Sequence, residues 1–191
     1  VICSNALDRS VKELGISDPA AILNQTRKFV IERFNKSESE IKDGMDIALC
    51  SLKFSENSAT LKYAGANNPL YHVKQIDENT TEKHTQDNHC YINEIRPDKQ
   101  PIGRYANDIS YTSHTIELKK GESIYIFTDG FADQFGGPKG KKLMYKPFKK
   151  MLLKYQNRRM NEQKESINNE FINWMGNHEQ IDDVCIMGVR C

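Results

Sequence analysis

The sequence has no hydrophobic run long enough to cross a membrane and no excess of positive charge. Its 27 basic and 26 acidic residues leave a formal net charge of +1, so the electrostatic basis for binding nucleic acid is missing. The mean hydropathy is -0.69, and the first residues do not have the pattern of a signal peptide. We therefore predict a cytoplasmic chain that binds no nucleic acid and makes no membrane contact, and leave open whether the parent protein is membrane-anchored.

Cysteine and histidine patterns that mark zinc sites or disulfide frameworks are also missing. The five cysteines include no C-x-x-C pair and no zinc-type spacing, and their number is odd. We interpret them as reduced thiols. The five histidines are scattered through the sequence, and none has a partner four residues away that would place two of them on one helix face.

A length of 191 residues predicts a single domain over residues 1–191. Apolar spacing predicts two helices, a run of strands, two further helices and a final strand, which is an α+β fold with helices packed on an antiparallel sheet. The polar stretch 76–108 is expected to be a surface excursion ordered in part by its "YINEI" segment. The predicted helices cover 1–14, 17–34, 146–156 and 160–176, and the strands 45–54, 59–66, 67–74, 109–118, 123–128 and 184–189.

The first predicted helix begins at the first residue, with no capping residue before it. Its apolar positions form one helical stripe, which is typical of a helix interior. We therefore expect the chain to be a piece of a longer protein. The stripe consists of Ile2, Ala6, Leu7, Val11 and Leu14.

Acidic residues stand at the ends of two predicted strands. Asp129 directly follows the strand at 123–128, and Asp182 and Asp183 directly precede the strand at 184–189. If these strands are antiparallel neighbours, the carboxylates converge at one edge of the sheet, and a cation would relieve their repulsion. Oxygen ligands without His or Cys favour Mg²⁺ or Mn²⁺. A structural interpretation stays open, because Asp-Gly after a strand is also a common turn.

The order of several segments resembles a known family. The segments "DGMDIALCSLKFSENSATLKYAGANNPLYHV", "PIGRY", "GESIYIFTDGFADQFGG" and "DDVCIMGVR" follow one another as in bacterial PP2C-like serine/threonine phosphatases of the sporulation-phosphatase and stress-regulator (SpoIIE-like) type. The resemblance implies an αββα sandwich of two antiparallel sheets flanked by helices. It also implies hydrolysis of phosphoserine or phosphothreonine by a two-metal site with Mn²⁺ or Mg²⁺.

By position, the resemblance implies that Asp129 and Asp182 are metal ligands and that no separate catalytic residue is needed. Gly130 and Asp183 would then support these ligands as neighbours. The family's first ligands come from an N-terminal D-x-x-D strand and a D-x-S/T-G-H-G element. The second is not found in this sequence, and the D-x-x-D of Asp43 and Asp46 stands at the start of the strand predicted at 45–54, where the family has no ligand. Ala66 stands where the family often has His. We therefore expect the 191 residues alone to be inactive or nearly so.

The glycine-rich segment "FGGPKGKK" lacks the spacing of a phosphate-binding P-loop. We interpret it as a mobile loop beside the site, in which Lys139, Lys141 and Lys142 attract a phosphoprotein substrate by electrostatic steering. A plain solvated loop is the alternative.

The resemblance implies a phosphorylated regulatory protein as substrate, in a bacterial signalling pathway such as a two-component system, and an upstream sensor or regulatory module in the parent chain. It leaves homodimer formation open. Two other classes of function stay open as well. One is a phosphatase-like interaction module without catalysis. The other is a receiver domain with Asp129 as phosphoacceptor, which the antiparallel strand pattern opposes.

Overall fold

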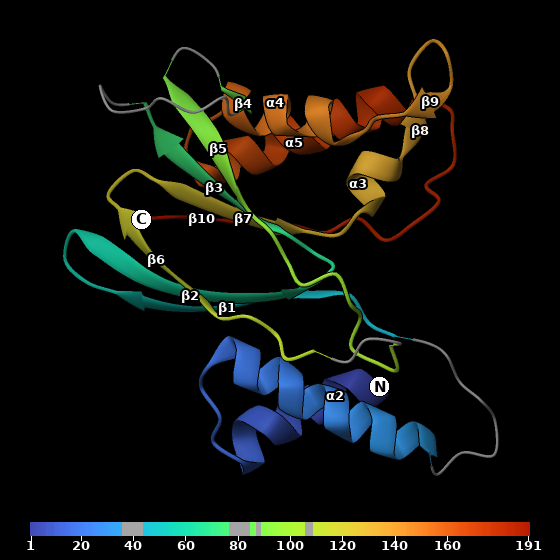
Figure 1. The fold of residues 1–191 in the computed structure, drawn as a ribbon. Coiled ribbons are helices and arrows are strands. Elements are labelled where there is room, and N and C mark those ends of the chain that lie inside the picture. Colours follow the sequence, from blue (N-terminus) through green and yellow to red (C-terminus); the bar gives the residue numbers. More distant parts are fainter. Residues whose placement is uncertain (36–43, 77–84, 87–88, 106–108) are drawn as a thin grey trace. The chain divides into compact units, whose positions relative to one another are not determined.

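The computed structural model describes residues 1–35, 44–76, 85–86, 89–105 and 109–191. The chain divides into two compact units, which are coloured by sequence in Figure 1. The first unit comprises Val1–Leu70 and Arg96–Lys119, and the second comprises Tyr71–Ile95 and Lys120–Cys191. The single domain over 1–191 stays a prediction. Within the described residues, no helix is both long and apolar enough to cross a membrane.

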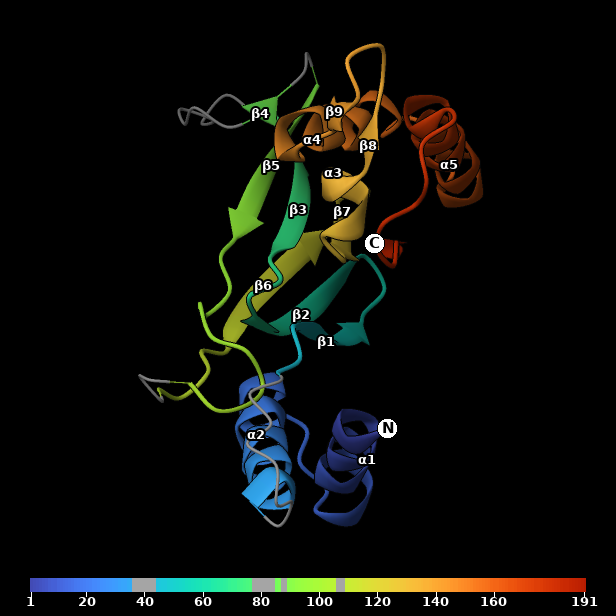
Figure 2. The same cartoon turned by 90° about the vertical axis from the view of Figure 1, so that its right-hand side faces the viewer.

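The first unit contains helices at its start and a three-stranded antiparallel sheet in the order β1-β2-β6. The strands predicted at 45–54 and 59–66 are confirmed as the antiparallel pair β1–β2, in which Ile47 pairs with Ala66 and Phe54 with Ala59. Figure 2 shows α1 and α2 next to each other. The elements are α1 (Ile2–Asp8), the π-helix η1 (Arg9–Glu13), α2 (Pro19–Asn35), β1 (Ile47–Phe54), β2 (Ser58–Ala66) and β6 (His114–Lys119).

Local sequence explains where α2 begins. Asp18 accepts a hydrogen bond from the backbone N–H of Ala21 at 3.1 Å and so caps the helix, and Pro19 takes the first helical position. The apolar face of α2, which includes Leu23 and Val30, then packs into a core with β2 residues such as Ala64.

The second unit contains a five-stranded sheet in the order β10-β7-β3-β5-β4, a small hairpin and three helices. The "YINEI" segment, which was expected to order part of the polar stretch, lies in strand β5, whereas the centre of the stretch, at 77–84 and 87–88, lies outside the described residues. The elements are β3 (Leu70–Gln75), β4 (Thr85–Gln86), β5 (Cys90–Ile95), β7 (Ser123–Phe127), α3 (Gly130–Asp133), β8 (Phe135–Gly136), β9 (Lys141–Lys142), α4 (Tyr145–Lys154), α5 (Met160–Met175) and β10 (Ile186–Arg190).

Aromatic side chains join the helices of the second unit to its sheet. The Phe148 ring of α4 lies 5.0 Å from Phe127 of β7 and 4.7 Å from Phe131 of α3, and Phe131 lies 5.0 Å from Phe171 of α5. All four rings are buried. The short helix α3 is therefore held in place by packing, although four residues would not form a stable helix by themselves. The α+β class with antiparallel sheets is confirmed in both units.

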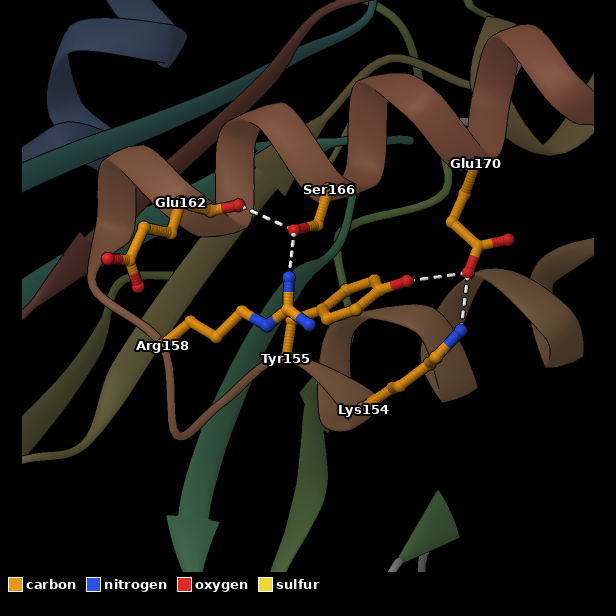
Figure 3. A network of polar contacts seen from close by, with 6 residues as sticks. All are labelled: Lys154, Tyr155, Arg158, Glu162, Ser166 and Glu170. Atoms are coloured by element: carbon orange, nitrogen blue, oxygen red, sulfur yellow. Dashed lines mark hydrogen bonds and ion pairs between the residues drawn. The ribbon is translucent and has the colours of Figure 1, made fainter.

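A polar network joins α4 to α5 (Figure 3). One carboxylate oxygen of Glu170 accepts hydrogen bonds from Lys154 Nζ and from the Tyr155 hydroxyl, both at 2.6 Å. Arg158 lies over the Tyr155 ring at 4.8 Å and donates to the Ser166 hydroxyl at 2.8 Å. The network therefore ties the end of α4 to the middle of α5.

The Glu170 network predicts an acid-sensitive contribution to stability. Hydrogen bonds from Lys154 and Tyr155 lower the pKa of Glu170, against a smaller opposing effect of burial. Stabilisation is thus complete above the unfolded carboxyl pKa of about 4.3 and is lost as the pH falls through the lower folded value. We expect Glu170→Gln to lower the free energy of unfolding by about 1 kcal/mol at pH 7. The variant should also lose the dependence of stability on acid pH that Glu170 causes. Urea unfolding at pH 7 and in the acid range measures both effects.

The matched control is Glu165→Gln, because Glu165 is an exposed carboxylate on the same helix. Its free energy of unfolding should lie within about 0.5 kcal/mol of that of the unmodified chain at both pH values. Equal behaviour of the two variants would contradict a stabilising role for the Glu170 network.

Candidate metal centre

The two acidic segments lie at the same end of one antiparallel strand pair. In the β7–β10 register Phe127 is opposite Ile186, so Asp129 lies two residues beyond the paired region, and Asp182 and Asp183 lie three or four residues before it. The expectation that these strands are antiparallel neighbours is confirmed (Figure 1). The carboxylates of Asp129, Asp182 and Asp183 are all on exposed residues. Segments more than fifty residues apart are thereby brought to one edge of the sheet.

Thr128 holds the two segments together beyond the last strand pair. Its backbone N–H donates to the Cys185 carbonyl at 3.0 Å, and its hydroxyl donates to the Asp183 carbonyl at 2.8 Å. The same hydroxyl accepts a hydrogen bond from the Cys185 N–H at 2.9 Å. The hydroxyl therefore replaces a regular strand contact and fixes the acidic segment against the end of β7. Sequence reasoning gave Thr128 no role, although it stands directly before Asp129.

Gly130 allows the two segments to approach closely. A Cβ atom at this position would lie 2.5 Å from the Asp183 carbonyl oxygen and 3.3 Å from the Asp182 Cβ atom. The first distance is well inside van der Waals contact, so any other residue would force the segments apart. Gly130 is thus required by space at the candidate site.

The carboxylates of Asp129 and Asp182 differ in their local contacts. Asp129 precedes α3, but its side chain makes no capping hydrogen bond to that helix. In Asp182, one carboxylate oxygen accepts the backbone N–H of the next residue, Asp183, at 2.7 Å, so this carboxylate has a local hydrogen-bond partner. A structural role therefore explains one contact of the Asp182 carboxylate. The Asp129 side chain, in contrast, has no capping role at the start of α3.

Tyr145, at the start of α4, lies within the electrostatic reach of the site. Burial raises the pKa of Tyr145, and the negative charges of Asp129, Asp133 and Glu94 raise this pKa further. Asp133 is itself paired with Lys142, whose Nζ lies 2.9 Å from the carboxylate. No sequence motif indicated Tyr145, because its position depends on how α4 packs.

The phenol of Tyr145 should report on the charge at Asp129. We expect Asp129→Asn to lower the pKa of Tyr145, because one of the negative charges that disfavour the phenolate is removed. Nuclear magnetic resonance of ring-labelled tyrosine measures this pKa, and Tyr145→Phe assigns the signal. The exposed Glu165→Gln should leave the pKa unchanged; a shift in this control, or none in Asp129→Asn, would contradict the proximity of Tyr145 to Asp129.

The glycine-rich segment is a β8–β9 hairpin packed on α5, in place of the mobile loop expected from its composition. The Gly137 N–H donates to the Trp174 carbonyl at 2.8 Å, and a Cβ on Gly136 would lie 1.9 Å from the same oxygen. The glycines are needed because the hairpin lies directly on the end of α5.

The three lysines of this hairpin have different surroundings. All three side chains belong to exposed residues, and Lys142 also pairs with Asp133. Their role in attracting substrate stays a prediction, and the ion pair makes Lys142 less available for it than the other two.

The donor chemistry at this edge of the sheet suits a hard divalent cation. Carboxylate oxygens are preferred ligands of Mg²⁺ and Mn²⁺, and no softer ligand accompanies Asp129 and Asp182 in sequence. Over the described ranges, no group of three or more His, Cys, Asp and Glu side chains is placed to hold a metal ion. Asp129 and Asp182 therefore have the ligand chemistry that such an ion prefers, and they are the two candidate protein ligands.

Comparison with known proteins places these features in a family. The family model for Stage II sporulation protein E matches residues 4–191. The PP2C domain of SiaA from Pseudomonas aeruginosa is 26% identical with a TM-score of 0.75, and the match covers 100% of this chain and 68% of that one. No curated protein sequence matches the chain.

Two further solved structures share the fold. The first holds the PP2C phosphatase domain and a regulatory fragment of SpoIIE from Bacillus subtilis, at 18% identity and a TM-score of 0.61, covering 98% of this chain and 48% of that one. The second is the PstP catalytic domain in complex with two manganese ions, at 11% identity and a TM-score of 0.54, covering 97% and 78%. With the family model matching nearly its whole length, the chain belongs to the Stage II sporulation protein E (SpoIIE) family and has a PP2C-type phosphatase fold.

Proposed function

We propose that the chain is part of a metal-dependent phosphoserine/phosphothreonine protein phosphatase domain, with Asp129 and Asp182 as ligands of Mn²⁺ or Mg²⁺. The observation that carries this proposal is the exposed Asp129 carboxylate, which makes no cap to α3 and lies at the same strand-pair end as Asp182. Burial or capping would give an aspartate at this position a structural reason, and Asp129 has neither. Membership of a phosphatase family supports the assignment.

The residues of this chain would contribute position and charge. A divalent pair in such a site lowers the pKa of bound water and neutralises negative charge on a phosphate ester. Thr128 and Gly130 keep the Asp182 segment against the end of β7, so that both carboxylates stay at one edge of the sheet. The exposed amino groups of Lys139 and Lys141 would attract the doubly charged phosphate of a substrate.

We propose further that these 191 residues hydrolyse phosphate esters slowly or not at all by themselves. The family's D-x-S/T-G-H-G element is not found in the sequence, and its N-terminal D-x-x-D strand has no match, because the D-x-x-D of Asp43 and Asp46 comes after the first two predicted helices. Two carboxylates alone bind Mn²⁺ or Mg²⁺ weakly, since affinity rises with the number of charged ligands. The substrate would be a phosphorylated regulatory protein, and an upstream sensor module would control the activity.

The deciding experiment is hydrolysis of p-nitrophenyl phosphate and of a phosphoserine peptide at millimolar Mn²⁺. The chain is compared with a version extended at its N-terminus by the family's two missing acidic elements. Activity that requires both the extension and Mn²⁺, and that a chelator removes, is the expected result. No activity in the folded, extended protein would contradict the proposal.

A second candidate function is a phosphatase-like module that binds a phosphoprotein without hydrolysing it. It is favoured by the finding that the described residues contain no cluster of three or more metal-binding side chains. Binding of the phosphoserine peptide by the extended protein without release of phosphate would support this candidate.

A further inference from the structure

Gln134, the residue after α3, makes an unusual set of contacts for a glutamine. Its side chain is fully buried, and the amide nitrogen donates to the carbonyls of Phe135 at 3.0 Å and Glu179 at 2.9 Å. Its backbone carbonyl accepts hydrogen bonds from the Trp174 indole and from the Leu143 N–H, both at 3.0 Å. The orientation of the amide is fixed chemically, because only its NH₂ end can donate to two carbonyl oxygens.

These contacts join the two segments that carry the candidate ligands. Gln134 lies five residues after Asp129, and Glu179 lies three residues before Asp182. Residues 176–181 form no helix or strand, so their path from α5 to β10 depends on individual contacts. The hydrogen bond from Gln134 to Glu179 fixes this path at a point between α5 and Asp182.

The other end of the amide indicates that packing alone does not explain Gln134. Its Oε1 is the one buried side-chain N or O atom, among the residues that the structure describes, without a hydrogen-bond partner. An unsatisfied buried acceptor costs about 1–3 kcal/mol. An apolar side chain of similar size would fill the same space without that cost. Unlike such a side chain, the amide donates a hydrogen bond to the Glu179 carbonyl.

We propose that Gln134 is a positioning residue, whose buried amide holds residues 176–181 so that Asp182 stays beside the end of β7 that carries Asp129. The role of Asp182 as a ligand rests on the proposed function, whereas the anchoring of the loop does not. Gln134 acts here through the backbone of Glu179 and touches neither metal nor substrate.

Two measurements on the 191-residue chain test this proposal. Hydrogen exchange of the peptide spanning 176–183 reports whether the loop is anchored, and calorimetric titration with Mn²⁺ reports the affinity of the site. Gln134→Met keeps the shape and removes both donors, and Gln134→Asn shortens the amide away from Glu179. We expect both variants to speed exchange in 176–183 and to weaken Mn²⁺ binding about tenfold or more, as loss of supporting contacts does in metal sites.

The matched control is Gln163→Met. Gln163 is also a buried glutamine, but its amide contacts Tyr125 and the carbonyl of Arg158, which lies just before α5. It should lose comparable stability while its Mn²⁺ affinity stays within about twofold, since a structural loss elsewhere does not move the ligands.

Each outcome decides one part of the proposal. Unchanged exchange in 176–183 in a folded Gln134 variant would overturn the anchoring, and so would an equal loss of Mn²⁺ affinity in Gln163→Met. If the unmodified chain binds no Mn²⁺, the proposed function loses its metal site, and the exchange measurement still decides whether Gln134 holds the loop. Gln134→Asn keeps the test valid if the methionine variant does not fold.

Discussion

Asp129→Asn should weaken Mn²⁺ binding to the chain at least about tenfold and abolish phosphate ester hydrolysis by the extended protein. The substitution replaces an anionic oxygen with a neutral amide of the same shape. Because the Asp129 side chain is exposed and makes no cap to α3, the free energy of unfolding should change by less than about 0.5 kcal/mol. Calorimetric Mn²⁺ titration, p-nitrophenyl phosphate hydrolysis and urea unfolding measure the three quantities.

Asp133→Asn is the matched control for this prediction. Asp133 lies one helical turn further on, and its carboxylate is paired with Lys142 at 2.9 Å. Loss of this partly exposed pair should cost at most about 1 kcal/mol and leave Mn²⁺ affinity unchanged. A variant of Asp129 that binds Mn²⁺ as well as the unmodified chain would remove Asp129 from the site, and equal losses in both variants would indicate a general charge effect.

Gly130→Ala should damage both the site and the stability of the second unit. The new Cβ would lie 2.5 Å from the carbonyl oxygen and 3.1 Å from the carbonyl carbon of Asp183, and both are backbone atoms that no side-chain rotation can move. Either α3 or the Asp182–Asp183 segment must shift, which strains the contacts of Thr128. We expect a loss of about 1–3 kcal/mol in unfolding free energy and of about a hundredfold in activity of the extended protein.

Gly15→Ala separates the two effects of a glycine substitution. Gly15 has a φ of +64° and no atom within 4 Å of an added Cβ, so its cost of about 1–2 kcal/mol comes only from the left-handed backbone. Its Mn²⁺ affinity should equal that of the unmodified chain. If Gly130→Ala matches Gly15→Ala in both stability and affinity, the close approach at Gly130 has no functional consequence.

Much of the fold follows from local patterns in the sequence. Asp18 and Pro19 stand at the start of α2, and the alternating residues of 45–54 and 59–66 form the predicted strands β1 and β2. The apolar segments before Asp129 and after Asp183 become the antiparallel strands β7 and β10. These features were predictable because capping, alternation and strand length depend on neighbouring residues. The same reasoning identified Asp129 and Asp182, since both lie at the boundaries of such segments.

Features that depend on contacts between distant segments were not predictable in this way. The glycine-rich segment 135–142 is a hairpin because Trp174 of α5 lies directly against its glycines. Tyr145 lies near Asp129 through the packing of α4, and Gln134 reaches Glu179 across 45 positions. Composition describes a single segment and contains no information about its eventual partner.

The sequence by itself therefore predicted the longer helices and strands, their order and the two carboxylates at the strand ends. Only the tertiary structure shows the contacts around those carboxylates, namely the Thr128 hydroxyl on the Asp183 carbonyl, the close approach at Gly130 and the hydrogen bond from Gln134 to Glu179. The physical reason is that secondary structure arises from interactions between near neighbours in the chain, whereas the geometry of a site depends on hydrogen bonds and close packing between segments that folding brings together.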